Sequence, residues 1–124
     1  MSERVTLTGP LGYRENLSLM AAARVELTDS GGVQEEASAL GIPCLILREN
    51  TERPITTVLG TNTLVGIDPS MIRRYFFDVV AGRYKAGVRI PLWDGRAAER
   101  AAEAIRSAWH IDDPEPAAAE LALS

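Results

Sequence analysis

The residues best suited to chemistry lie between Thr28 and Glu36, where a short β-like run gives way to a helical pattern. Ser30, Gly31 and Gly32 stand at that junction. Paired glycines let a backbone approach a ligand closely, and the start of the next helix offers free N–H groups and a positive dipole end. These features favour a bound phosphate. A helix cap at Ser30 and a steric need for the glycines explain the same residues without a ligand, so both interpretations stay open.

A carboxylate follows this junction at a useful distance. Glu36 lies about one turn into the helix from the glycines, where it can accept two hydrogen bonds from the vicinal hydroxyls of a ribose. For Glu35 we expect helix-dipole stabilisation or solvation instead. The helical spacing puts Val33 and Ala37 on the apolar face and leaves Gln34 and Glu35 facing elsewhere.

A second polar cluster, Arg48 to Pro54, leaves the carboxyl end of the apolar run Cys44 to Leu47. Ligands of open α/β sheets bind at that edge. We therefore expect Arg53 and Glu52 to meet a ligand that lies on the Ser30 to Gly32 turn. A solvated loop is the alternative interpretation.

Other chemistries fit the sequence poorly. Ser30 lacks the surroundings of a nucleophile elbow, and the single histidine, His110, lies in a polar segment near the end. Asp29 has no second aspartate nearby for phosphotransfer. Cys44 sits inside an apolar run, which predicts an inert core thiol. No arrangement of residues suggests a metal site, and none calls for a cofactor.

The elements that must position these residues alternate between short β-like and longer helix-like runs. This rhythm predicts an α/β fold, a Rossmann-like parallel sheet with flanking helices. Strands are expected at 4–8, 25–28, 44–47 and 62–66, and helices at 15–23, 33–40, 54–59, 69–80 and 96–109. We expect residues 1–111 to form a single domain, followed by an acidic, Ala-rich tail, 112–124, that is a frayed helix or disordered.

The composition sets further limits. With 124 residues and 46% hydrophobic residues, the chain is sized for one core. It has no signal-peptide pattern and no apolar run approaching the roughly 18 residues of a membrane span, so we expect no membrane association and a cytoplasmic location. The formal charge of −4 argues against nucleic acid as a partner. Twelve of the thirteen cationic residues are arginines, which suit phosphate or carboxylate recognition.

Five stretches of the sequence resemble a known family. The run from Asp29 to Glu36 (DSGGVQEE), with Gly41-Ile42-Pro43 and Thr51-Glu52-Arg53-Pro54, resembles the non-hydrolysing UDP-N-acetylglucosamine 2-epimerases. Pro10-Leu11-Gly12-Tyr13 and Trp93-Asp94-Gly95 match the family in order and spacing, so the resemblance covers about 7–105. It implies the later part of the second, nucleotide-binding domain of a glycosyltransferase-B-type fold. At Asn16 and Leu17 the chain departs from the family, which often has an aromatic residue near the uracil.

The resemblance also implies a function. The family interconverts UDP-GlcNAc and UDP-ManNAc by eliminating UDP across C1 and C2 and adding it back, without a redox cofactor. By resemblance, Ser30, Gly31 and Gly32 hold the diphosphate, Glu36 holds the ribose hydroxyls, and Arg53 stabilises the departing UDP. The family's catalytic acid and base come from parts that precede this stretch. We therefore expect the chain alone to bind UDP or UDP-GlcNAc and to be inactive.

Two other classes of function are alternatives to this one. A non-catalytic nucleotide-sugar-binding or interaction module is the main alternative, and half of a glycosyltransferase is a third, which the Thr51 to Pro54 loop disfavours. The family's role implies cell-surface polysaccharide biosynthesis. Because the run from Cys44 to Leu47 needs neighbours on both sides, we also expect a homodimer or association with a missing first domain.

Overall fold

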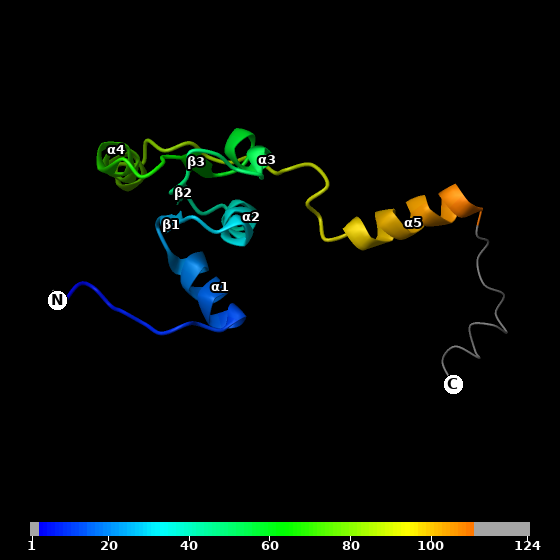
Figure 1. Ribbon diagram of the computed structural model, residues 1–124, viewed down its shortest axis with the longest axis horizontal. Coiled ribbons are helices and arrows are strands. Elements are labelled where there is room, and N and C mark those ends of the chain that lie inside the picture. Colours follow the sequence, from blue (N-terminus) through cyan, green and yellow to red (C-terminus); the bar gives the residue numbers. More distant parts are fainter. Residues whose placement is uncertain (1–2, 111–124) are drawn as a thin grey trace. The chain divides into compact units, whose positions relative to one another are not determined.

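The fold is built on a parallel, three-stranded sheet. The computed structural model describes residues 3–110, and the chain divides after Ile90 into two compact units. The first unit holds the sheet, in the order β1-β2-β3 (Figure 1). The strands are β1 (Glu26–Thr28), β2 (Cys44–Ile46) and β3 (Asn62–Leu64), with Glu26 beside Cys44 and Cys44 beside Asn62. The predicted α/β fold with a parallel sheet is thus confirmed.

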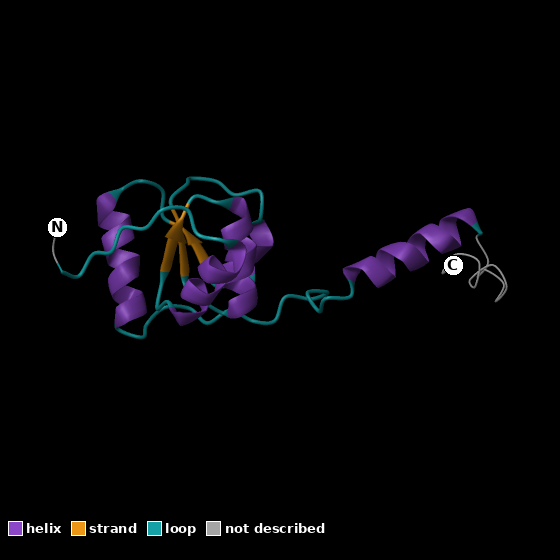
Figure 2. Ribbon diagram, turned by 90° about the horizontal axis from the view of Figure 1, so that it is seen from below, coloured by secondary structure: helices purple, strands orange, loops and turns teal. Residues whose placement is uncertain are grey.

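Helices flank this sheet on both sides. Within the first unit, α2 and α4 lie on opposite sides of the sheet (Figure 1), and Figure 2 shows the strands enclosed between helices. The second unit contains one described helix, α5 (Ala97–Trp109). The helices of the first unit are α1 (Tyr13–Ala22), α2 (Gly31–Leu40), α3 (Pro54–Val58) and α4 (Pro69–Val80).

The core of the first unit forms around β2. All three residues of this strand are buried, which explains why its sequence is apolar throughout rather than alternating. Met20 from α1 and Ala37 from α2 pack with Cys44 and Ile46, and Val33 and Leu64 cover the cluster. The core therefore fixes α2 against the strand whose end leads into the Arg48 to Pro54 loop.

Two sequence-based expectations are wrong. Residues 4–8 form no strand; they take no regular structure, and Val5 and Leu7 are exposed. A β-prone run becomes a strand only when a neighbouring strand accepts its hydrogen bonds, and β1 pairs only with β2 in the part of the chain that the structure describes. The second helix begins at Gly31 rather than at residue 33. A first helical turn has N–H groups without intrahelical acceptors, so it tolerates glycine.

The remaining boundaries lie within two residues of the predicted ones, and α4 begins and ends as predicted. The tail, 112–124, lies outside the described residues. The expectation of a single domain over 1–111 stays a prediction.

Candidate functional site

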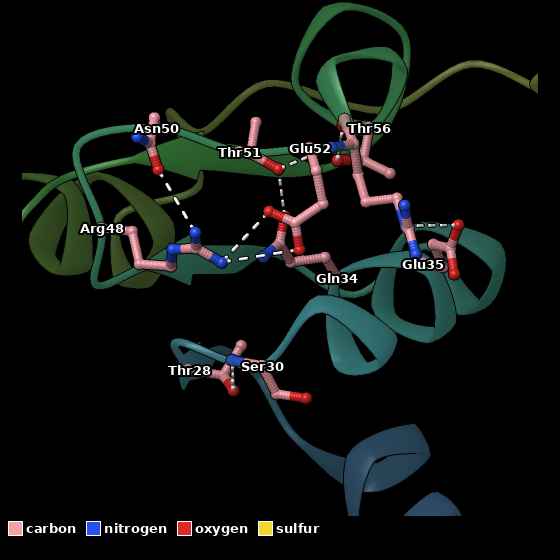
Figure 3. A network of polar contacts seen from close by, with 10 residues as sticks. Thr28, Ser30, Gln34, Glu35, Arg48, Asn50, Thr51, Glu52 and Thr56 are labelled. Atoms are coloured by element: carbon pink, nitrogen blue, oxygen red, sulfur yellow. Dashed lines mark hydrogen bonds and ion pairs between the residues drawn. The ribbon is translucent and has the colours of Figure 1, made fainter.

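The site begins where β1 passes into α2. Ser30 is the N-cap residue, with φ −77° and ψ 129°, but its side chain makes no capping hydrogen bond. Its backbone N–H donates to Thr28 Oγ1 at 3.0 Å instead (Figure 3). Ser30 is exposed, and its hydroxyl has no partner among residues 3–110. The capping interpretation of this serine is therefore wrong, and the hydroxyl is available to a ligand.

Neither glycine of the pair is required by the fold. Gly31 and Gly32 do not have positive φ angles. A Cβ added to Gly32 meets nothing within 4 Å, and one added to Gly31 meets only the Glu52 carboxylate, with Oε1 at 2.7 Å. The Glu52 carboxylate is the end of a flexible side chain and can move aside, so this contact is a weak reason for a glycine at Gly31. The described residues therefore give only a weak steric reason for Gly31 and none for Gly32.

Glu36 lies on the same side of α2 as Gly32, one turn further along. It is half-buried, and its side chain takes part in no hydrogen bond or ion pair within residues 3–110. Its carboxylate oxygens are therefore free to accept hydrogen bonds from a molecule bound at the start of the helix.

The loop after β2 supplies the other side of the site. Arg48 Nη1 lies 3.1 Å from Glu52 Oε2, and Arg48 Nη2 donates to Asn50 Oδ1 at 3.3 Å (Figure 3). The pKa of Glu52 is lowered, first by a hydrogen bond from its own backbone N–H and further by Arg48 and Arg53. The Glu52 carboxylate is therefore ionised at neutral pH.

A buried amide joins this loop to α2. Gln34 is fully buried, and its Oε1 accepts a hydrogen bond from the Thr51 hydroxyl at 2.6 Å (Figure 3). The Thr51 hydroxyl oxygen also accepts a hydrogen bond from the Arg53 backbone N–H at 2.9 Å. The backbone carbonyl of Gln34 accepts one from Asn62 Nδ2 at 2.9 Å. The sequence pattern put Gln34 on the polar face, so its burial was missed. No local sequence signal predicts the burial of Gln34, because the loop that covers this side chain is distant in sequence.

Arg53 reaches the first turns of α2 through an ion pair. Its Nε atom lies 2.9 Å from Glu35 Oε1, and both side chains are about half exposed. The Nε–H does not point at the carboxylate oxygen and has no well-directed acceptor. Glu35 thus holds a cation beside the site, rather than serving only the helix dipole or solvation as expected.

A cavity of about 400 Å³ adjoins this loop at the carboxyl ends of β2 and β3. Arg48 forms part of its wall. The other lining residues are Glu49, Leu64, Val65, Gly66, Ile67 and Asp68.

Other reactive side chains do not join the site. Burial raises the pKa of the Cys44 thiol to about 12, which agrees with the predicted inert core cysteine. Among residues 3–110 no three His, Cys, Asp or Glu side chains are grouped to hold a metal ion. Over the same range, none of the helices has the length and apolar character needed to cross a bilayer.

Comparison with known proteins decides the family. The model of the family described as UDP-N-acetylglucosamine 2-epimerase matches residues 1–106. The chain belongs to the UDP-N-acetylglucosamine 2-epimerase family. Among curated members, the UDP-N-acetylglucosamine 2-epimerase of Escherichia coli K12 is 39% identical over 109 residues, which is 85% of this chain and 29% of that enzyme. The Methanocaldococcus jannaschii epimerase is 39% identical over 99 residues, 80% of this chain and 26% of that enzyme.

Solved structures of the epimerase family agree with the fold. The Methanocaldococcus jannaschii UDP-GlcNAc 2-epimerase in complex with UDP-GlcNAc and UDP has a TM-score of 0.73 at 36% identity, covering 85% of this chain and 28% of that one. The Neisseria meningitidis enzyme bound to UDP-GlcNAc has a TM-score of 0.57 at 40% identity, covering 60% of this chain and 20% of that one. The chain therefore spans less than a third of the length of these epimerases.

Proposed function

We propose that this chain is the UDP-binding portion of a UDP-GlcNAc 2-epimerase. The observation that carries the proposal is the start of α2, which presents an unpartnered Ser30 hydroxyl and two glycines that the fold itself does not need. A diphosphate bound there accepts hydrogen bonds from the first-turn N–H groups and meets the positive end of the helix dipole. In this proposal Ser30, Gly31 and Gly32 hold the diphosphate.

The two sides of α2 suit the two ends of such a ligand. Glu36 shares a side with Gly32 and has free carboxylate oxygens, so it takes the ribose hydroxyls. Glu35 follows Gly31 by one turn on the neighbouring face of α2 and pairs with Arg53. In this proposal the Arg53 guanidinium lies beside the phosphate whose bond to the sugar breaks. Arg53 then stabilises the negative charge that develops on UDP as it leaves C1.

The reaction we propose for the whole enzyme is elimination of UDP from UDP-GlcNAc and its re-addition to give UDP-ManNAc. These steps need a general base at C2 and a general acid. Of the carboxylates beside the site, Glu35 is paired with Arg53, Glu52 is paired with Arg48, and Glu36 is the residue proposed to bind the ribose hydroxyls. Ion-paired carboxylates are poor bases, so we expect this chain alone to bind the nucleotide without epimerising it.

The same observation favours a second candidate, a non-catalytic nucleotide-sugar-binding or interaction module. The two candidates differ in whether a further polypeptide supplies an acid and a base. Adding UDP-GlcNAc to the purified chain in heavy water, with proton exchange at C2 followed by NMR, tests for residual chemistry. Exchange above a buffer control would contradict the expected inactivity.

Association is part of the proposal. We propose that the chain forms a homodimer or pairs with a first domain, because β1 and β3 are sheet edges and α4 exposes Phe76 and Phe77. Light scattering over a dilution series measures the mass, and a value near 13.4 kDa at every concentration would exclude the dimer. A cytoplasmic location and a role in cell-surface polysaccharide biosynthesis belong to the same proposal.

Titration calorimetry with UDP and with pyrophosphate tests the proposed site. Glu36→Ala should weaken UDP about tenfold or more, because hydrogen bonds to a charged group are lost, and should leave pyrophosphate almost unchanged. Pyrophosphate thus serves as the internal control in the same variant. Equal weakening of both ligands would contradict the role of Glu36, and failure of both to bind the wild-type chain would contradict the proposed function.

A further inference from the structure

The Glu52 carboxylate stands where an incoming anion is expected. A Cβ built on Gly31 would lie 2.7 Å from Glu52 Oε1, so this oxygen lies directly against the first residue of α2. The N–H groups of a first helical turn lack intrahelical acceptors and attract negative charge. Glu52 makes no hydrogen bond to them among residues 3–110. The carboxylate thus lies at the helix start without satisfying its donors.

Arg48 holds this carboxylate in place. Its Nη1 atom lies 3.1 Å from Oε2 and 3.5 Å from Oε1 of Glu52. The two side chains are 37% and 48% exposed, respectively, so water competes with the pair and the interaction is weak. A guanidinium fits phosphate oxygens as well as carboxylate oxygens. Arg48 can therefore change partners at little cost.

A buried donor beside this pair provides independent evidence for a ligand. Gln34 is fully buried, and its Nε2 has no hydrogen-bond partner. Gln34 lies one turn beyond Gly31, and helical side chains lean toward the N-terminus, so its amide faces the start of α2. Its Oε1 is held by Thr51, the residue before Glu52, and Figure 3 shows this contact beside the Arg48–Glu52 pair. The orphan donor needs an oxygen acceptor, which a phosphate supplies.

We propose that Glu52 is an internal counter-anion of the diphosphate site and that Arg48 exchanges it for a phosphate oxygen when the ligand binds. This inference rests on the proposed function and adds Arg48 and Glu52 to its residues. The ligand chemistry is a diphosphate, whether free or part of a nucleotide. Arg48 then joins Arg53 as a second cation on the loop side of α2.

The exchange gives Glu52 and Arg48 opposite effects on the affinity for a diphosphate. The Glu52 carboxylate is ionised, so it repels a diphosphate until it moves away from Gly31. Arg48 is released from Glu52 and gains a more highly charged partner. Removing the carboxylate should therefore tighten anion binding, and removing the guanidinium should weaken it. Both effects should fall as salt screens the charges.

Calorimetry with pyrophosphate and UDP tests these directions on three variants of the full chain. Glu52→Gln should bind both ligands about threefold to fivefold tighter, the scale of an exposed charge interaction. Arg48→Gln should bind both more weakly. Glu49→Gln is the matched control, because it removes the same charge from an exposed loop residue without an ion pair, and it should stay within about twofold of wild type.

The outcomes separate this inference from the proposed function. If pyrophosphate and UDP bind none of the proteins, the proposed function fails. If they bind wild type but Glu52→Gln binds equally or more weakly, the counter-anion role alone is overturned, and Glu52 instead holds the loop in its binding conformation.

A crystal structure of the wild-type chain with pyrophosphate gives a readout that no variant's folding can obscure. It should place Arg48 within hydrogen-bond distance of a phosphate oxygen and the Glu52 carboxylate away from Gly31. An intact Arg48–Glu52 pair beside bound pyrophosphate would overturn the exchange.

Discussion

Replacing Gly32 by alanine should make the protein more stable and a worse binder. The backbone at Gly32 is helical, and the added methyl group meets nothing within 4 Å. Alanine loses less conformational entropy on folding, so we expect the free energy of unfolding to rise by about 0.5 kcal/mol. This is the low end of the usual range for glycine-to-alanine changes, because Gly32 lies in the first turn of the helix. For a unit of this size the gain corresponds to a rise of roughly 2–4 °C in Tm.

In the proposed site, the same methyl group lies where a phosphate oxygen approaches the helix. We expect Gly32→Ala to bind UDP and pyrophosphate about tenfold more weakly, a loss of roughly 1.4 kcal/mol. Thermal melts followed by circular dichroism give the stability, and calorimetry gives the affinity. Gly41→Ala is the control from the other end of α2. With φ +72°, Gly41 is left-handed, so alanine there should cost about 1–2 kcal/mol and leave the affinity unchanged.

Two results would refute this reasoning. Unchanged affinity in Gly32→Ala would mean that no ligand approaches the helix at this residue. A lower Tm would mean that the chain itself needs the glycine, and the main argument for a ligand would then be lost.

Two further predictions concern a buried thiol and a partly buried carboxyl group of the sheet. Because burial raises the pKa of the Cys44 thiol to about 12, a thiol reagent at pH 8 should modify it only as the protein unfolds, and fast modification of the native chain would contradict the predicted packing. Burial also raises the pKa of Glu26, so its protonated form favours the folded state, and this stabilisation is present at low pH and lost as pH rises through the folded-state pKa. Glu26→Gln should therefore raise Tm at pH 7 and change it little near pH 3, whereas a lower Tm at pH 7 would show that the Glu26 carboxylate is stabilising.

The sequence was most informative where a feature depends on neighbours along the chain. The apolar run at Cys44 predicted a covered central strand, because no other element hides four successive apolar residues so readily. The Pro69 start and apolar spacing of α4 predicted that helix. The residues 4–8 show the limit of such reasoning. Their β-like composition is real, but a strand also needs an edge to pair with.

The sequence predicted single residues of the candidate site but not the contacts between them. Ser30 and the glycines could be singled out from local chemistry, and that chemistry does not depend on the remainder of the fold. The burial of Gln34 could not, because it depends on how closely the loop after β2 approaches α2, and the Arg48–Glu52 pair depends on the conformation of that loop. That approach is set by the packing of β2 against α2 in the core. The same dependence hid the ion pair between Arg53 and Glu35.

The backbone amide signals of Gly31 and Gly32 during an NMR titration with UDP test the central claim most directly. If the start of α2 holds the diphosphate, these signals should shift with UDP and with pyrophosphate, because both ligands place phosphate oxygens against the same N–H groups. Uridine, which lacks phosphate, should shift them far less. Saturable UDP binding that leaves both signals in place, or that shifts only residues away from α2, would contradict the account.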